Sequence, residues 1–158
     1  RSLSNKLHFL NLNSANADIF CISETWLNGA SNFYLKGFDI VRLDRNDKRA
    51  GGVAILIKNS VKYKVKQLDY NCNNKLEICA VELFLAEDTF VLVSCYRPPN
   101  SQFISQVEWT EFFKQFKRKF LVTGDFNAHH LLWGGENNCH NGVSLEEGIS
   151  RADVAVLN

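Results

Sequence analysis

Residues 75–96 form a long, mostly apolar stretch that constrains the fold more than any other part of the sequence. The stretch reads KLEICAVELFLAEDTFVLVSCY, and both halves are rich in the branched and aromatic residues that favour strands. Glu87 and Asp88 separate the halves, so the stretch predicts a hairpin of two long strands. Pro98 and Pro99 end the second strand, because proline has no N–H for a sheet ladder.

The segments around this hairpin place the chain in the mixed α/β or α+β class. Residues 101–119 repeat apolar side chains on one face, as an amphipathic helix does, and FLVTG at 120–124 reads as a short buried strand. A capping-box pattern, Ser144 followed by Glu147, predicts the start of a last helix. Further strands are predicted at 18–23, 37–44, 50–58 and 63–68, a helix at 4–17 and a loop at 129–142; residues 144–158 are predicted to be a helix that leads to a final apolar stretch.

Size and composition indicate one domain, 1–158, and exclude several classes of protein. The 158 residues suit a single domain, and 46% apolar residues are enough for a core. A net charge of +1 does not by itself indicate nucleic-acid binding, although 61–66 and 114–119 are locally basic. The five cysteines form no CxxC pair, which favours a reducing, intracellular setting. No apolar run is long enough to cross a membrane.

Several predicted strands end in polar side chains that strand propensity does not explain. Glu24 follows the first strand, Tyr96 ends the hairpin, and Asp125 and Asn127 follow the strand FLVT. If these strands are neighbours in one sheet, the four side chains form an oxygen-rich site suited to Mg²⁺ and a phosphate substrate. Taken singly, each has a structural alternative: Glu24 at a helix start, Tyr96 as a strand aromatic, Asp125 and Asn127 in an Asx turn.

Four motifs, occurring in a fixed order, give the chain a family resemblance. They are CISETWL (21–27), RNDKRAGGVAILIK (45–58), SCYRPPN (94–100) and VTGDFNAHHLLWG (122–134). Over essentially its whole length the chain resembles the endonuclease/exonuclease/phosphatase superfamily, most of all the apurinic-type endonuclease domains of non-LTR (LINE-like) retrotransposons. The resemblance implies an α/β (α+β) fold, a four-layered sandwich that is incomplete here, with the second sheet largely missing.

The resemblance also implies metal-dependent hydrolysis of a phosphodiester, with roles assigned by position. Glu24 is the implied ligand of Mg²⁺ or Mn²⁺, and Tyr96 the implied donor to the scissile phosphate. Asp125 is the implied acid/base group, and Asn127 orients it and contacts phosphate. These roles agree with residue type, because an Asp held by donors and metal stays ionised and can position water.

Other positions receive supporting roles from the same resemblance. Those implied to contact DNA phosphates, through close backbone approach or a guanidinium group, are Arg49, Gly51, Gly52 and Arg97. His130 and Trp133 are implied to be structural residues beside the site. Zinc is a rival explanation, since four zinc-ligand types lie close in sequence: His129, His130, Cys139 and His140. Their spacing is not that of a zinc finger, and adjacent side chains point apart.

The implied partners are DNA and the remainder of a retrotransposon reverse transcriptase polyprotein, and the implied location is the nucleus. The family's pattern also includes an Asn before Arg1 and, beyond residue 158, an Asp and an SDH segment that this sequence lacks. We therefore expect little or no nuclease activity from this chain alone, and an exposed apolar sheet face. The alternatives are a phosphatase or deadenylase of the same superfamily, which CYRPP and RAGGVAILIK disfavour, and a degenerate, non-catalytic remnant.

Overall fold

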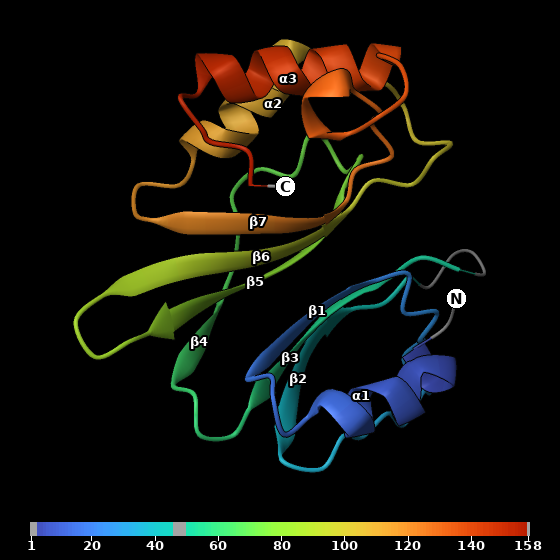
Figure 1. The fold of residues 1–158 in the computed structure, drawn as a ribbon, viewed down its shortest axis with the longest axis vertical. Helices are drawn as coiled ribbons and strands as arrows, with labels where there is room; N and C mark the ends of the chain where they lie inside the picture. The colour runs from blue at the N-terminus through green and yellow to red at the C-terminus, as the bar shows by residue number, and fades with distance from the viewer. Residues whose placement is uncertain (1–2, 46–49, 158) are drawn as a thin grey trace. The chain divides into compact units, whose positions relative to one another are not determined.

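A computed structural model describes residues 3–45 and 50–157 of the chain (Figure 1). The chain divides into two compact units, which we describe separately. The first unit comprises residues 1–67, 77–96 and 118–125. The second comprises residues 68–76, 97–117 and 126–158.

The first unit contains two β-sheets. A three-stranded sheet has the order β1-β3-β2, and a four-stranded sheet has the order β4-β5-β6-β7. Neighbouring strands are antiparallel except for β6 and β7, which run parallel. The strands are β1 (Ile19–Ser23), β2 (Phe38–Leu43), β3 (Val53–Lys58), β4 (Tyr63–Lys66), β5 (Glu77–Phe84), β6 (Thr89–Tyr96) and β7 (Phe120–Asp125).

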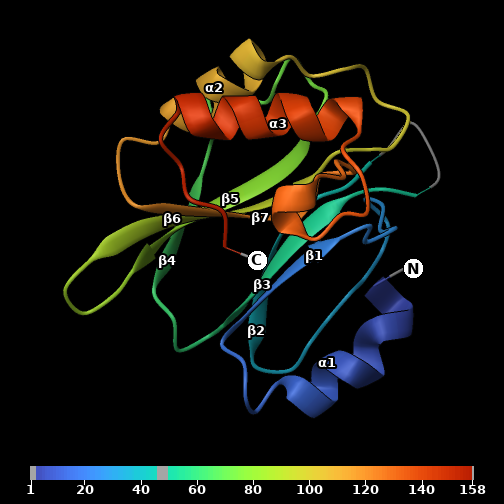
Figure 2. The same cartoon turned by 45° about the horizontal axis from the view of Figure 1, so that its top comes forward.

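Strand β3 is buried on both of its faces, which explains its almost uninterrupted apolar sequence. On one face Val53, Ile55 and Ile57 pack with residues of the other sheet, such as Val81 of β5. On the other face Leu56 belongs to a cluster that includes residues of two short helices. These are η1 (Leu3–Lys6) and α1 (Leu7–Asn13), and Figure 2 shows α1 next to this sheet. The first unit therefore has a core on each side of the β1-β3-β2 sheet.

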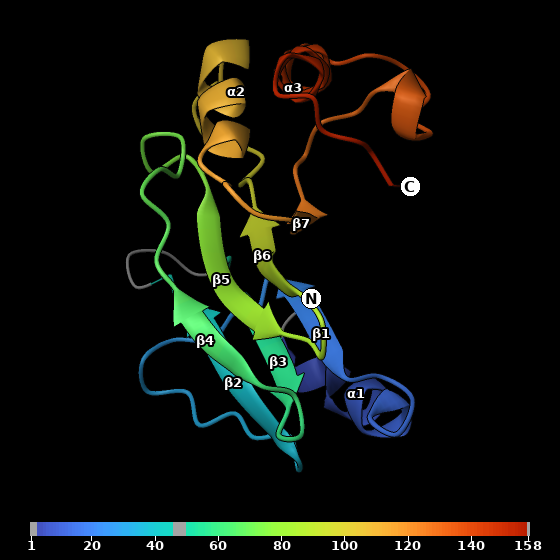
Figure 3. The same ribbon diagram turned by 90° about the vertical axis from the view of Figure 1, so that its left-hand side faces the viewer.

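The second unit is mainly helical. Its helices are α2 (Gln106–Lys114), the short η2 (Leu131–Trp133) and α3 (His140–Arg151), and Figure 3 shows α2 and α3 side by side. Trp109 of α2 is 1% exposed, and its ring lies 6.0 Å from the rings of Phe112 and Phe126. A Cβ on Gly148 would lie 2.3 Å from the Cβ of Trp109, so glycine permits this close helix contact.

The structure confirms the mixed α/β class and the hairpin of residues 75–96. The predicted start of the last helix is wrong: α3 begins at His140 with Cys139 as its N-cap, so part of the predicted loop is helical. Ser144 lies within the helix, where its Oγ donates a hydrogen bond to the carbonyl oxygen of Ile104 at 2.7 Å. The helix predicted over 101–119 is shorter than expected, because a capping box at Ser105 starts it later. Among the described residues, no helix has the length and apolarity needed to cross a bilayer.

Candidate active site

Strand β7 carries Asp125 to a position opposite Tyr96 of β6. The register of the two parallel strands pairs Gly124 with Cys95 and Asp125 with Tyr96. At Gly124 φ is +151°, and a Cβ there would lie 1.7 Å from the carbonyl oxygen of Cys95. Only glycine allows the two backbones to approach this closely. The glycine of the GDFN motif therefore places Asp125 beside Tyr96.

Glu24 reaches the same edge of the first unit from the end of β1. Ser23 Oγ donates a hydrogen bond to the carbonyl oxygen of Cys95 at 3.3 Å, which ties the end of β1 to β6. The hydroxyl of Tyr96 donates to Oε1 of Glu24 at 2.7 Å. The structure thus brings together three of the side chains predicted from strand ends: Glu24, Tyr96 and Asp125.

Tyr96 is held in its protonated form. Burial raises the pKa of Tyr96, and the hydrogen bond to Glu24 and the charges of Glu24 and Asp125 raise it further, against an opposing effect of Arg45. The residue is 3% exposed, so the phenol is largely shielded from water. A phenol in this state is a hydrogen-bond donor throughout the physiological pH range.

Glu24 lies in a strained backbone segment. At both Glu24 and Trp26 φ is +56°, a left-handed conformation that is uncommon for residues with a side chain. The N–H of Thr25 donates to the carbonyl oxygen of Gly52 at 3.1 Å, and that of Trp26 to Gly51 at 2.9 Å. Strain of this kind persists only where surrounding contacts hold it, and it is concentrated at active sites.

Two charged residues near this segment were missed in the sequence, Glu77 and Arg45. Glu77 Oε1 accepts a hydrogen bond from Arg45 Nε at 2.5 Å, and Oε2 accepts one from the N–H of Gly52 at 2.6 Å. Glu77 of β5 is also the register partner of Tyr96. The alternation of β5 places Glu77 on the face of Cys79 and Val81, which belong to the core, so a carboxylate is unexpected at this position. The signal that could have found it was the register of the predicted hairpin.

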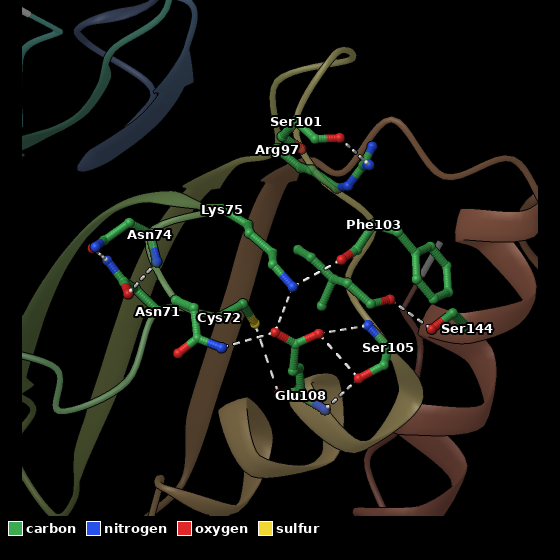
Figure 4. Close-up of polar contacts among 12 residues, drawn as sticks. Asn71, Cys72, Asn74, Lys75, Arg97, Ser101, Phe103, Ser105, Glu108 and Ser144 are labelled. Atoms are coloured by element: carbon green, nitrogen blue, oxygen red, sulfur yellow. Dashed lines mark hydrogen bonds and ion pairs between the residues drawn. The ribbon is translucent and has the colours of Figure 1, made fainter.

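Asn127 and Arg97 belong to the second unit. Asn127 Nδ2 donates to the carbonyl oxygen of Arg97 at 2.8 Å. The Arg97 side chain is 2% exposed, and its Nη2 donates to the carbonyl oxygen of Ser101 at 3.3 Å (Figure 4). Burial lowers the pKa of Arg97, and its Nε and Nη1 have no partner among the residues that the structure describes. A phosphate contact by Arg97 stays a prediction.

A polar network around Glu108 fixes the loop that leads from Arg97 to α2 (Figure 4). Lys75 Nζ donates to the carbonyl oxygen of Phe103 at 2.8 Å and to Glu108 Oε1 at 2.6 Å. Glu108 Oε2 accepts from the N–H of Ser105 at 2.9 Å, which completes the capping box of α2. Burial opposes ionisation of Glu108, but hydrogen bonds from Lys75, Ser105 and Asn73 outweigh it and lower its pKa to about 2. This carboxylate is structural.

The positions expected to contact DNA phosphates have other neighbours in the structure or lie outside it. Arg49 is outside the described residues. A Cβ on Gly51 would lie 2.6 Å from the guanidinium carbon of Arg45, and one on Gly52 would lie 2.4 Å from Oγ1 of Thr25. Both glycines therefore allow close packing within the protein. Their contact with DNA stays a prediction.

The histidine- and cysteine-containing segment has defined structural contacts. His130 is 8% exposed, its Nδ1 accepts a backbone N–H at the start of η2, and its ring lies 4.8 Å from that of Trp133. Cys139 Sγ accepts hydrogen bonds from the N–H of His129 at 3.2 Å and from a backbone N–H of α3 at 3.3 Å. In the parts of the chain that the structure describes, no three His, Cys, Asp or Glu side chains are grouped to hold a metal.

Glu24 and Asp125 border a cavity of about 790 Å³ within the first unit. Its walls are largely apolar and include Phe9, Phe20 and Leu121, of which Phe9 is 61% and Leu121 40% exposed. Carboxylate oxygens are the preferred ligands of Mg²⁺ and Mn²⁺, and such ions are commonly held by one or two carboxylates plus substrate oxygens. The donor set at this edge therefore fits a hard divalent cation better than zinc.

The chain is similar to known proteins of one family. Residues 8–156 match the Endonuclease/Exonuclease/phosphatase family. The solved endonuclease domain of TRAS1, a telomere-specific non-LTR retrotransposon, superposes with a TM-score of 0.76 at 18% identity, covering 100% of this chain and 70% of that one. Because the identity is low, this likeness establishes the fold alone.

The sequence relatives come from mobile elements of Drosophila. The chain is 26% identical over 143 residues to the RNA-directed DNA polymerase from mobile element jockey of Drosophila funebris. It is 32% identical over 144 residues to the probable RNA-directed DNA polymerase from transposon X-element of Drosophila melanogaster. These matches cover 90% and 89% of the chain but 15% of each relative. With the family match spanning nearly all of its residues, the chain belongs to the endonuclease/exonuclease/phosphatase family and has the retrotransposon endonuclease-type fold.

Proposed function

We propose that this chain is the endonuclease domain of a retrotransposon polyprotein, and that the domain nicks target DNA in the nucleus with Mg²⁺ or Mn²⁺. The observation that carries the proposal is the convergence of Glu24, Tyr96 and Asp125 at one edge of the first unit. Two carboxylates and a protonated phenol beside a cavity suit phosphodiester hydrolysis better than binding alone. The family membership and the retrotransposon relatives support DNA as the substrate.

Each side chain has a distinct task in the proposed reaction. Tyr96 donates its one hydroxyl proton to Glu24 in the free chain, and on substrate binding it would redirect this proton to a non-bridging oxygen of the scissile phosphate and stabilise the charge that develops there. Asp125, which is exposed, accepts a proton from the attacking water as the water oxygen bonds to phosphorus and one ester P–O bond breaks. Asn127 follows Asp125 by two residues, and its Nδ2 donates a hydrogen bond to the carbonyl oxygen of Arg97. This bond fixes the Asn127 side chain, so Asn127 is the proposed residue that orients phosphate.

Glu24 is the proposed ligand of the divalent cation. When bound, the cation supplies a Lewis acid for the phosphate oxygens and the leaving group. Oε1 of Glu24 accepts the hydrogen bond from Tyr96, and the carboxylate has further lone pairs with which it would hold an ion. The same hydrogen bond fixes the direction of the carboxylate before any ion binds.

A plasmid-nicking assay tests the proposal. The chain alone is compared with a chimaera that adds the parts of the TRAS1 endonuclease domain outside the matched region, each with Mg²⁺ and with a chelator. We expect the chimaera to nick supercoiled DNA and the chain alone to show little activity, because the chain covers 70% of that domain. Asp125→Asn should lower nicking by about 100-fold or more, as loss of a general base does.

The control substitution is Glu82→Gln. Glu82 lies on β5, the strand of Glu77, and its carboxylate pairs with Arg118 at the surface. It should leave nicking unchanged. Nicking that survives Asp125→Asn would contradict the assigned roles. Absence of nicking by a folded chimaera, together with hydrolysis of an RNA or a phosphomonoester, would point instead to another substrate within the same family.

A further inference from the structure

The segment that carries Glu24 faces a second segment with equally unusual backbone. Glu24 and Trp26 have φ values of +56°, and Ala50, Gly51 and Gly52 have values of +79°, +90° and +83°. Left-handed conformations at residues with a Cβ are unfavourable by themselves. Gly51 and Gly52 adopt such values without cost, but the first segment and Ala50 are not expected to keep this shape without contacts that impose it.

The two segments hold each other through their backbones. The N–H of Thr25 donates to Gly52 at 3.1 Å and the N–H of Trp26 donates to Gly51 at 2.9 Å. Thr25 is fully buried, with its Oγ1 against the position that a Cβ of residue 52 would occupy. The position of Glu24 therefore follows from the position of the turn at residues 50–52.

Glu77 is the side chain that holds this turn. Its Oε2 accepts the N–H of Gly52 at 2.6 Å, and its Oε1 accepts Nε of Arg45 at 2.5 Å. The Arg45 guanidinium group packs directly against Gly51. The Glu77 and Arg45 side chains are 16% and 19% exposed, so the contacts are largely shielded from water. One carboxylate thus fixes both glycines of the turn.

Glu77 is also paired with Tyr96, the second residue that holds Glu24 in place. Glu77 of β5 is the register partner of Tyr96 of β6, whose hydroxyl holds Oε1 of Glu24 at 2.7 Å. Glu24 is therefore held from two directions by one pair of strands: through its side chain by Tyr96, and through its backbone by the turn that Glu77 fixes.

We propose that Glu77 is a positioning residue of the active site, which sets the direction of the Glu24 carboxylate through Gly52 and Arg45. The proposal rests on the proposed function where it treats Glu24 as an ion ligand. Its central claim, that Glu77 controls the backbone of residues 24–26, is independent of any ion.

Amide hydrogen exchange measured by NMR tests that central claim. In Glu77→Gln one of the two acceptor oxygens becomes an NH2 donor and the charge is lost, so the hold on Arg45 and Gly52 weakens and the amides of Thr25 and Trp26 should exchange at least ten-fold faster. In the matched control Glu82→Gln, on the same strand, their exchange should stay within two-fold of the unsubstituted chain. Unchanged exchange at both amides in Glu77→Gln would overturn the proposal.

Tb³⁺ binding, detected by luminescence sensitised by nearby aromatic side chains, tests the consequence for Glu24. We expect at least ten-fold weaker binding in Glu77→Gln and unchanged binding in Glu82→Gln. Glu24→Gln serves as the reference for the proposed ion site. If Tb³⁺ binding survives Glu24→Gln while the exchange effect of Glu77→Gln is present, the metal assignment fails and the positioning role stands.

A double variant separates positioning from simple stabilisation. Arg45→Met with Glu77→Leu replaces a largely shielded ion pair by apolar side chains, an exchange that is often neutral or favourable for stability when the pair is buried. It also removes the acceptor for the N–H of Gly52. We expect a thermal midpoint near that of the unsubstituted chain, but fast exchange at Thr25 and Trp26 and weak Tb³⁺ binding. Slow exchange and normal ion binding in this variant would show that the pair only stabilises the fold.

Discussion

The carboxylates of Glu108 in the second unit and Glu24 in the first are surrounded in opposite ways. Glu108 accepts four hydrogen bonds: from Lys75 at 2.6 Å, from the N–H of Ser105 at 2.9 Å, from the Oγ of Ser105 at 3.0 Å and from Asn73 at 3.0 Å. For Glu24, the described residues supply one hydrogen bond, from Tyr96. A saturated carboxylate has no lone pairs left for a ligand, whereas Glu24 keeps an oxygen for one.

The backbone around Glu108 is regular and favourable by itself, whereas the backbone around Glu24 is strained. Glu108 stands at the third position of a regular helix, in a capping box that is favourable by itself. Glu24 stands in a segment with positive φ that other parts of the first unit must hold. The difference indicates that the second unit uses its carboxylate for stability, and that the first unit gives up local stability to present one.

The largest expected effect concerns the glycine that brings Asp125 to the site. Gly124→Ala would place a Cβ 1.7 Å from the carbonyl oxygen of Cys95, against backbone that cannot move without separating β6 from β7. We expect a loss of about 3 kcal/mol or more in the free energy of unfolding, measured with urea. Gly29→Ala, where nothing lies within 4 Å of the added Cβ, is the control and should change it by about 0.5 kcal/mol or less. Equal changes in the free energy of unfolding for Gly124→Ala and Gly29→Ala would contradict the close approach of the β6 and β7 backbones.

Removing each carboxylate in turn tests the comparison directly. Glu108→Gln weakens several charge-assisted hydrogen bonds and should lower the free energy of unfolding by about 2 kcal/mol. Glu24→Gln keeps an acceptor for Tyr96 and removes a negative charge near Asp125, so it should change stability by about 0.5 kcal/mol or less. Urea unfolding at neutral pH measures the change in the free energy of unfolding for both variants. A larger loss for Glu24→Gln would mean that Glu24 is a structural residue.

The sequence predicts much of the fold because its strands are long and apolar, but local patterns mislead where tertiary contacts decide. The pattern S-x-x-E occurs at Ser105–Glu108 and at Ser144–Glu147. The first is a true capping box. At the second, the Ser144 hydroxyl is drawn to the carbonyl oxygen of Ile104, and the helix begins four residues earlier at His140. Only the packing of α3 distinguishes the two.

The candidate site shows the same limit. Glu24, Tyr96 and Asp125 are readable from sequence, because each is a polar residue at the end of an apolar run. Arg45 is not, and Glu77 is indicated only by the register of the predicted hairpin, because the importance of both residues lies in contacts to a turn that is distant in sequence. The role of Gly124 is visible only once the register pairs it with Cys95. Pattern identifies the groups that carry chemistry, and three-dimensional structure identifies what holds them.

Acidification should weaken the second unit's network through Glu108. Its pKa is lowered from an ordinary 4.5 to about 2, so its contribution to stability is fully present above pH 4.5 and is lost as the pH falls through 2. Between these pH values the unsubstituted chain should lose about 1–2 kcal/mol more than Glu108→Gln, after allowance for solvent screening. Urea unfolding across this pH range measures the difference. Equal losses of stability in the unsubstituted chain and in Glu108→Gln would contradict a lowered pKa of Glu108.

The smallest expected effect separates buried from exposed charge pairing. Lys119 of the first unit pairs with Asp88, but their side chains are 77% and 44% exposed, whereas Lys75 and Glu108 are 14% and 18% exposed. Lys75→Gln should lower stability by about 1 kcal/mol, because a shielded carboxylate loses its charged donor. Lys119→Gln should leave the thermal midpoint unchanged within error at physiological salt, since water and ions replace an exposed partner. A measurable shift for Lys119→Gln would mean that stability follows the number of ion pairs and not their burial, and the contrast between Glu108 and Glu24 would then need another explanation.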